Sequence, residues 1–448
     1  MSNLKQILAP ELTLLDGRFV PHARIGIDAS GQIASVTIAQ PGSAEKGTAS
    51  TLPESSIRRL PGRALLPGFV NVHSHAFQRA LRGHGETYPE GMGDFWSWRE
   101  AMYALVEKLT PDELRRVTVQ AFREMLASGY TTVGEFHYVH HVAPARLDFE
   151  LDRIIVEAAA EVGIRLALLM CYYKTGGVNR PLAGGQLRFS TPVVKTFLKQ
   201  VDAISASLDQ RTQTLAIAPH SLRAVPPDDL KELCREANRR GCFAHVHIEE
   251  QVKEIEEVQA ALGRTPMEWL LDNVELGPRF TAIHCTHAVS PRLDTYLKSG
   301  AKVCLCPLTE GNLGDGIAEV GRMMARPDSI CIGSDSNIRI DPFEELRWLE
   351  FVQRLGRQKR GVTRTPACDN DIARQLQRIG SLNGAAALGL NTGAIEPGRL
   401  ADLITLDLAH PSLAGWTPDT LLASAITGAG ADIVKDICVG GQWRNTKN

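Results

Sequence analysis

The chain has 448 residues, of which 44% are apolar and 22% charged, and its 49 basic side chains nearly balance 51 acidic ones. The length favours a large domain plus a smaller one, and the composition is typical of a soluble globular protein and gives no reason to expect a nucleic-acid partner. Because no run of 18 apolar residues occurs and the first 17 residues include acidic ones, we expect no membrane partner and a cytoplasmic location.

Both ends of the chain are predicted to form β-hairpins. Near the N-terminus, "ELTLLDGRFV" and "ARIGIDASGQIASVTIA" carry Asp-Gly and Ser-Gly turn signals between apolar runs. Near the C-terminus, "LADLITLDL" and "IVKDICVGGQW" have the same character, with Gly-Gly at the second turn. We therefore predict a small β-sandwich domain that is assembled from both termini, residues 1–65 and 393–448.

The central part of the chain alternates apolar runs with amphipathic stretches. Eight runs are rich in β-branched residues and end in polar ones, and eight parallel strands close a barrel. The fold class is therefore α/β, with a (β/α)8 TIM-type barrel over residues 66–392. The predicted strands lie in residues 64–75, 129–138, 163–173, 214–225, 242–250, 279–287, 301–312 and 329–337.

Helix-capping residues support the prediction that the segments between these strands are helical. Thr110, Pro111 and Glu113 match an N-cap, a first-turn proline and a capping box. The segment "PPDDLKELCREANRRG" begins with proline and acids and ends with basic residues and Gly241, as the helix dipole and a glycine C-cap favour.

Two histidines end the first barrel strand. Residues two apart in a strand project from one face, so His73 and His75 are expected to point into the barrel near its C-terminal mouth, where active sites of this fold lie. Taken alone, an HxH pair is equally compatible with buried histidines that each bond one backbone partner.

Other strand ends add metal-type side chains. The fifth run ends in "HVHIEE", with His247 and Glu250, the sixth at His284 and the eighth at Asp335. Catalytic zinc takes nitrogen and oxygen donors and keeps one position open for water. We predict one divalent metal ion per chain, Zn²⁺, held by His73, His75, His247 and Asp335. The alternative is that these residues only fill a polar barrel mouth.

The remaining candidates are weaker. Cys304 and Cys306 could bind metal, but a buried strand position is the favoured interpretation for a single CxC pair. His245 lies one strand step deeper than His247 and is assigned a supporting role, as is His287. His137, His140 and His141 cluster after the second strand, where they are expected to line the loop or support the site, with a second metal site as the alternative. Glu310 and Asn312, placed in the loop after the seventh strand, are expected to orient substrate or close the pocket, with a helix-capping or turn role as the alternative.

The motifs resemble those of the amidohydrolase superfamily, in its mononuclear deaminase branch. They are "PGFVNVHSH", HxxE in the fifth run, "HC" in the sixth and "SD" in the eighth. Binuclear members use a carboxylated lysine from the fourth strand, but "APHSLRAV" has none here, which favours one metal ion. Lys174, after the third run, is interpreted as an ordinary loop charge.

Within this branch the resemblance narrows to the formimidoylglutamate deiminases, on "NVHSHAFQRALRG", "FWSWREAMY", "EFHYVHH", "APHSLRAV", "HVHIEEQ" and "CPLTEGNLGDG". It implies hydrolysis of N-formimidoyl-L-glutamate to N-formyl-L-glutamate and ammonia in histidine degradation, and a homodimer. The small-molecule dicarboxylate substrate would be bound by Gln78, Arg99, Tyr138, His220 and Arg223. From the residues alone, Arg99 could instead be a surface residue stacked on tryptophan or paired locally.

The implied chemistry is attack of a zinc-activated water on the amidine carbon. The catalytic residues are expected to be Glu250, His284 and Asp335: Glu250 and Asp335 accept the proton, His284 stabilises the tetrahedral state, and Glu250 protonates the leaving nitrogen. Two alternatives stay open. One is a deaminase of an aromatic heterocycle such as guanine, cytosine or an adenosine derivative, and the other is a noncatalytic homologue with a structural role.

Overall fold

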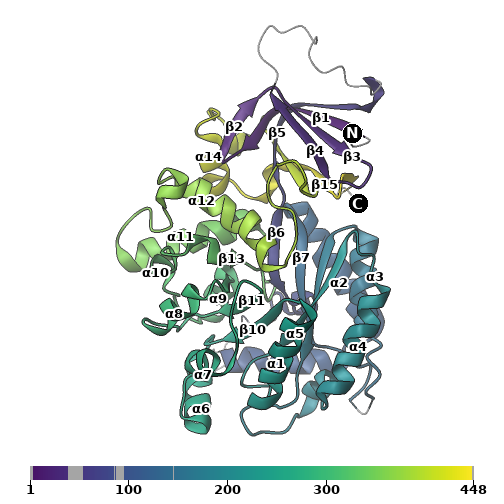
Figure 1. Ribbon diagram of the computed structural model, residues 1–448, viewed down its shortest axis with the longest axis vertical. Helices are drawn as coiled ribbons and strands as arrows, with labels where there is room; N and C mark the ends of the chain where they lie inside the picture. Colours follow the sequence, from purple (N-terminus) through teal and green to yellow (C-terminus); the bar gives the residue numbers. More distant parts are fainter. Residues whose placement is uncertain (1–3, 39–53, 85, 87–94, 145, 446–448) are drawn as a thin grey trace.

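The computed structural model describes residues 4–38, 54–84, 86, 95–144 and 146–445. A β-sheet built from both chain termini lies above a barrel of strands and helices (Figure 1). The ends of the predicted small domain, residues 1–3 and 446–448, fall outside the described ranges. No helix in the described part of the chain is long and apolar enough to cross a membrane.

The eight predicted barrel strands are present and parallel, in sequence order around one sheet. The first and last strands are joined where Asp335 N–H donates to His73 O (3.0 Å) and His75 N–H donates to Asp335 O (2.9 Å). The (β/α)8 prediction is thus confirmed. The strands are β6 (Phe69–Ser74), β7 (Tyr130–His137), β8 (Arg165–Tyr172), β9 (Gln213–Pro219), β10 (Ala244–Ile248), β11 (Phe280–His284), β12 (Lys302–Leu305) and β13 (Ile330–Ile332).

One predicted run is divided between the two sheets. The apolar stretch 64–75 begins in β5 (Ile57–Pro67), which belongs to the upper sheet, and continues after Gly68 in β6 of the barrel. Both strands are fully buried at this junction. An uninterrupted apolar run therefore conceals the change of sheet.

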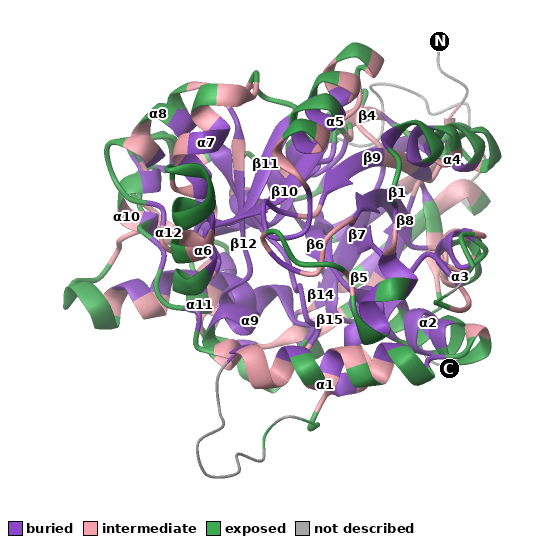
Figure 2. Cartoon of the chain, turned by 90° about the horizontal axis from the view of Figure 1, so that it is seen from below, coloured by how far each residue is buried: buried purple, intermediate pink, exposed green. Residues whose placement is uncertain are grey.

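Helices surround the buried strands of the barrel, as Figure 2 shows from below. The capping box at α2 (Pro111–Ser128) is formed as predicted, with Thr110 accepting from Glu113 N–H, and α5 (Pro227–Arg240) ends at a left-handed Gly241. The other helices of the barrel are α1 (Phe95–Lys108), α3 (Asp152–Val162), α4 (Val194–Ser207), α6 (Val252–Leu262), α7 (Pro266–Asn273), α8 (Arg292–Lys298), α9 (Pro307–Leu313), α10 (Val320–Met323) and α11 (Pro342–Arg357).

The upper sheet is one mixed sheet of eight strands. It has the order β16-β15-β14-β5-β1-β3-β4, with β2 on β1, and the predicted hairpins are formed at both ends of the chain. Apart from β5, its strands are β1 (Leu4–Leu15), β2 (Arg18–Pro21), β3 (Ala23–Asp28), β4 (Ile33–Ile38), β14 (Leu403–Asp407), β15 (Val434–Val439) and β16 (Gln442–Arg444). The domain limits at residues 65 and 393 stay predictions.

The sheet and the barrel are packed and ion-paired together. Leu66 and Ile404 belong to the same apolar core as the barrel strands, and both are fully buried. Arg165, at the start of β8, makes a buried two-pronged pair with Asp402, with Nε–Oδ2 at 2.6 Å and Nη2–Oδ1 at 2.9 Å. The apolar packing and the ion pair thus hold the upper sheet against the N-terminal end of the barrel strands. The opposite end of the barrel is covered by the loops and α1.

Candidate active site at the barrel mouth

Four side chains predicted to bind metal converge at the end of the barrel. The Nε2 atoms of His73 and His75 lie 3.2 and 3.3 Å from Asp335 Oδ1. His247 Nε2 lies 3.1 Å from His73 Nε2, and the four ligand atoms are all within 4.8 Å of one another. Ligands of a tetrahedral zinc ion are about 3.3 Å apart, so these spacings match a single ion.

The protonation of these histidines supports a cation site. His75 Nδ1 is 2.8 Å from Phe136 O and His247 Nδ1 is 3.0 Å from His220 O, contacts that require a proton on Nδ1. Burial lowers the pKa of His247 well below its usual range, so its ring is neutral and Nε2 carries a lone pair. Lone pairs that face one another and a carboxylate repel unless a cation lies among them, so the donor set fits a divalent metal.

Glu250 and His284 lie beside this group. His284 Nε2 is 3.8 Å from Glu250 Oε1 and 3.9 Å from Asp335 Oδ2, while Nδ1 is 3.2 Å from Glu310 Oε1. Burial lowers the pKa of His284, but the surrounding carboxylates outweigh this effect and raise the pKa to about 10. His284 is therefore protonated at neutral pH, and its Nε2 has no hydrogen-bond partner among the described residues.

The backbone holds these side chains in an uncommon conformation. His284 and Asp335 have φ values of 70° and 43°, in the left-handed region that residues other than glycine seldom adopt. His284 is the last residue of β11, and Asp335 lies three residues past the end of β13, so the left-handed conformation occurs where the chain leaves each strand. Such backbone outliers concentrate at functional sites.

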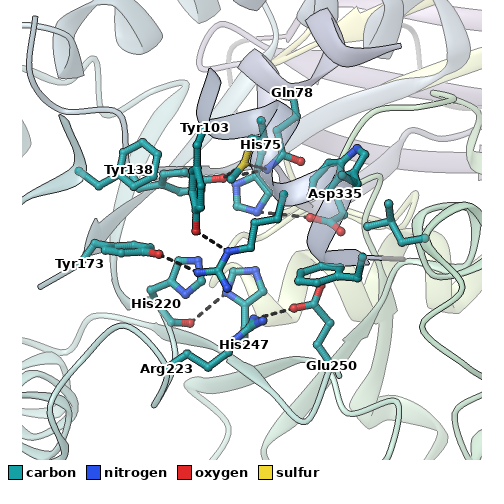
Figure 3. Close-up of a pocket in the computed structure, with 16 residues that line it drawn as sticks. His75, Gln78, Tyr103, Tyr138, Tyr173, His220, Arg223, His247, Glu250 and Asp335 are labelled. Atoms are coloured by element: carbon teal, nitrogen blue, oxygen red, sulfur yellow. Dashed lines mark hydrogen bonds and ion pairs between the residues drawn. The ribbon is translucent and has the colours of Figure 1, made fainter. Parts of the chain in front are cut away.

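A cavity of about 50 Å³ opens above the metal-type group, and Figure 3 shows the side chains that surround it. Helix α1 contributes one face, since positions 95, 98, 99, 102 and 103 recur at helical spacing. All five residues predicted to bind substrate line this cavity: Gln78, Arg99, Tyr138, His220 and Arg223. Their roles as substrate ligands stay predictions, but the structure brings them together.

Their contacts differ. Gln78 Nε2 donates to Tyr138 Oη at 2.8 Å, so these two neutral side chains form one unit. Arg223 Nη2 donates to Glu250 Oε2 at 2.6 Å. Arg99 is bonded to Tyr103 and Tyr173 and lies 5.3 Å from the Trp96 ring centre. Arg99 therefore does lie beside a tryptophan and pairs locally, as the alternative interpretation expected. It is not a surface residue, however, because it lines the cavity and is only 9% exposed.

The other candidates lie outside the four-residue group. His137 Nε2 and His140 Nδ1 are 3.2 and 2.7 Å from the buried Asp152 Oδ1, which gives a separate cluster behind the cavity. His140 Nε2 also bonds Cys171 O at 2.7 Å. Lys174 pairs with Asp229 at 2.7 Å, in keeping with an ordinary loop charge.

The loop expected after the seventh strand is a short helix. Glu310 and Asn312 belong to α9, because Pro307 starts a helical turn directly after Cys306 and Gly314 ends it in the left-handed conformation. Cys304 and Cys306 are both buried, and Cys306 lies close enough to His284 and Asp335 to form a second group of metal-type atoms with them. His245 is fully buried below His247, and burial lowers its pKa to about 4.

Sequence patterns did not identify several residues of the site. Tyr103 and Gln186 come from α1 and from the short helix η3 (Gly184–Phe189), and nothing in their local sequence marks them. Tyr173 directly follows β8. Because functional residues of this fold lie at the C-terminal ends of the barrel strands, its position in the sequence could have identified it. Glu254 also lies here, 3.8 Å from Arg223 Nε, and burial raises its pKa to about 7.

Comparisons with known proteins agree with this architecture. Residues 64–444 match the model of the amidohydrolase family. The formimidoylglutamate deiminase of Pseudomonas aeruginosa is 39% identical over 391 residues, which are 85% of this chain and 84% of that protein. The 5'-deoxyadenosine deaminase of Methanothermobacter thermautotrophicus is 29% identical over 85% of this chain and 81% of its own length.

A solved structure is similar over nearly the whole chain. The crystal structure of an amidohydrolase from Brucella melitensis superposes with a TM-score of 0.83 at 31% identity, covering 98% of this chain and 94% of that one. The barrel, its terminal sheet, the match over residues 64–444 and the similarity to a formimidoylglutamate deiminase lead to one conclusion: this chain belongs to the amidohydrolase family.

Proposed function

We propose that the protein hydrolyses N-formimidoyl-L-glutamate to N-formyl-L-glutamate and ammonia. The observation that carries this proposal is that two buried arginines, Arg99 and Arg223, line the same cavity as three of the four metal-type side chains. A substrate with two carboxylates and one small amidine needs two cationic anchors near one hydrolytic centre. Similarity to the deiminase of P. aeruginosa supports the same reaction.

The cofactor in this proposal is one divalent metal ion per chain, with Zn²⁺ the best fit to three histidines and one carboxylate. When bound, such an ion supplies a Lewis acid that brings the pKa of a water molecule to about 7. His73, His75, His247 and Asp335 would hold it. The neutral state of the buried imidazoles is the state that metal ligation requires.

The proton transfers are assigned to the neighbouring side chains. Glu250 accepts a proton from the attacking water and delivers it to the terminal nitrogen of the amidine, which leaves as ammonia. Asp335 shares the acceptance of that proton. His284 is a buried cation whose Nε2 proton has no protein partner in the described chain, so it can stabilise negative charge on the oxygen that adds to the amidine carbon.

Deamination of an aromatic heterocycle is the second candidate. Phe95, Trp98 and Phe189 line the cavity and could stack on a ring, and the 5'-deoxyadenosine deaminase is a more distant relative. Two arginines in the cavity favour the dicarboxylate over this alternative. A role in histidine degradation, a cytoplasmic location and a homodimer complete the proposal.

Ammonia release tests the proposal directly. Purified zinc-loaded protein is incubated with N-formimidoyl-L-glutamate, N-formimidoyl-L-aspartate, guanine and cytosine. Rapid release from the glutamate compound is expected. Activity on a ring amine alone would replace the substrate assignment, and no release from any compound would leave a noncatalytic homologue.

A further inference from the structure

Arg99 is a buried cation whose partners are neutral. Its Nε donates to Tyr103 Oη, and Nη2 donates to Tyr173 Oη at 3.2 Å. No carboxylate of a described residue lies within ion-pair distance of it, in contrast to Arg223, which pairs with Glu250. Burying a charge without a counter-charge is costly, so this guanidinium is suited to an anionic ligand.

Gln186 holds the two tyrosine hydroxyls. Its Nε2 lies 2.9 Å from Tyr103 Oη and 3.3 Å from both Tyr173 Oη and Gly176 O, to which it donates, while its Oε1 accepts from Ala183 N–H at 3.1 Å. The latter bond fixes the amide orientation, so Gln186 can only donate to the tyrosines. Both hydroxyls thus accept from N–H donors. Even where one hydroxyl donates to the other, at least one phenolic proton is left for a ligand.

The segment around Gln186 is locked onto α1. A Cβ at Gly185 would lie 2.5 Å from Tyr103 O, so the two backbones are in direct contact and only glycine fits there. The buried Arg188 donates to Leu109 O at 2.7 Å, just past the end of α1. Thr191 N–H donates to Tyr173 O at 2.9 Å and ties the same segment to the end of β8. These contacts fix where the Arg99 guanidinium lies.

The metal-type group is fixed independently by the barrel strands. Arg223 contacts Glu250 beside that group, whereas Arg99 contacts tyrosines that do not belong to it. The separation between the Arg99 site and the hydrolytic centre is therefore set by rigid elements on both sides. A flexible arginine could adapt to ligands of different length, but a tethered one selects a single length.

We propose that Tyr103 and Tyr173, with Arg99, bind the carboxylate at the far end of the substrate, and that Gln186 is a positioning residue that makes this site selective for the length of the dicarboxylate. This inference rests on the proposed deiminase function. Figure 3 shows Tyr103 and Tyr173 on the same side of the cavity, across from Glu250. The proposal predicts that a compound one carbon shorter is a poor substrate, because the two sites are held apart by rigid elements.

The test compares kcat/KM for three compounds: N-formimidoyl-L-glutamate, N-formimidoyl-L-aspartate and N-formimidoyl-L-norvaline, which lacks the far carboxylate. In Tyr173→Phe and Gln186→Leu, the preference for the glutamate compound over the other two is expected to fall about tenfold, through KM. The kcat/KM of the norvaline compound should change much less than that of the glutamate compound, since it has no carboxylate to place at this site.

Gln213→Leu is the matched control. Gln213 also bonds two backbone groups, Val156 O and Asp209 N, but lies at the start of β9, at the opposite end of the barrel. Its ratios should equal those of the wild type, and thermal unfolding shows whether the variants fold. Tyr173→Phe removes a single oxygen and gives the readout if Gln186→Leu is unstable.

The outcomes separate the two proposals. An active wild type whose preference is unchanged in both variants, or reduced equally for all three compounds, would overturn the length-selecting role while the deiminase function stands. A wild type inactive on all three compounds would overturn the proposed function and this inference together.

Discussion

Arg223 Nη2 lies 2.6 Å from Glu250 Oε2 inside the cavity. The residue proposed to anchor a substrate carboxylate is thus paired with the residue proposed to move protons. Burial raises the pKa of Glu250, but the charges of Arg223 and His284 outweigh this effect and lower the pKa overall. The carboxylate is therefore ionised in the free protein. A substrate carboxylate that engages Arg223 must compete with Glu250, which couples binding to the state of the proton acceptor.

Replacing Glu250 with Gln should lower kcat by about a hundredfold or more while metal content is unchanged, because the amide keeps the shape but cannot accept the proton. Steady-state ammonia release and atomic absorption on the same sample measure both quantities. Turnover near that of the wild type would remove Glu250 from the proposed mechanism.

Arg223→Met should lower kcat/KM by about 30-fold or more, since it removes the anchor and leaves the buried Glu250 without its counter-charge. Most of the effect is expected in KM. Arg211→Met is the control, because the Arg211 side chain is 83% exposed and pairs with Asp209 on the surface. An unchanged KM in Arg223→Met would exclude this residue as a carboxylate anchor.

His247→Ala should abolish tight metal binding, whereas His140→Ala should keep one metal ion per chain. Both ring nitrogens of His140 are already engaged in hydrogen bonds, Nδ1 with Asp152 Oδ1 and Nε2 with Cys171 O, each at 2.7 Å, so this cluster is satisfied without an ion. Metal analysis after dialysis distinguishes the two sites. Two ions per wild-type chain, with one lost in His140→Ala, would show that the cluster around Asp152 also binds metal.

Glu135 provides a pH-dependent test of stability. Burial raises the pKa of its carboxyl group to about 8 from an ordinary value of 4.5, against the hydrogen bond that Oε1 accepts from Ala76 N–H. A group with a raised pKa contributes its full stability below pH 4.5, and this contribution is lost as the pH rises towards 8. The wild type should therefore lose stability over this range.

Glu135→Gln removes the titration but keeps a hydrogen-bonding side chain of the same shape. The thermal unfolding midpoints of wild type and variant should diverge between pH 5 and pH 8. At the upper end of this range the free energy of unfolding of the variant should exceed that of the wild type by on the order of a few kcal/mol. Glu157→Gln, on the exposed face of α3, is the control. Parallel curves for wild type and Glu135→Gln would contradict the buried titration.

Gly134→Ala should destabilise the barrel by about 1–3 kcal/mol. A Cβ at position 134 in β7 would lie 2.3 Å from the backbone oxygen of Val72, which cannot move without breaking the contact between β6 and β7. Gly428→Ala, in α14 (Leu421–Gly428), meets no atom within 4 Å and should be neutral. Denaturant unfolding of both variants compares them, and equal stability would contradict the close approach.

Local patterns in the sequence predicted most of the architecture. The alternation of apolar runs with capped helices predicted eight barrel strands and the terminal hairpins, because period and capping chemistry are properties of neighbouring residues. The spacing of His73 and His75 predicted that both face the barrel interior, and strand-end positions identified His247, His284 and Asp335. These features need no knowledge of distant contacts.

Only the tertiary structure decided the rest. The change of sheet at Gly68 was concealed because the end of β5 and all of β6 are buried and read as one apolar run. The bonds among Tyr103, Tyr173 and Gln186 join segments more than ten residues apart, and the pairing of Arg223 with Glu250 spans 27 positions. Sequence alone determined which side chains could do chemistry, whereas folding decided which of them meet, since contacts between distant segments leave no local pattern.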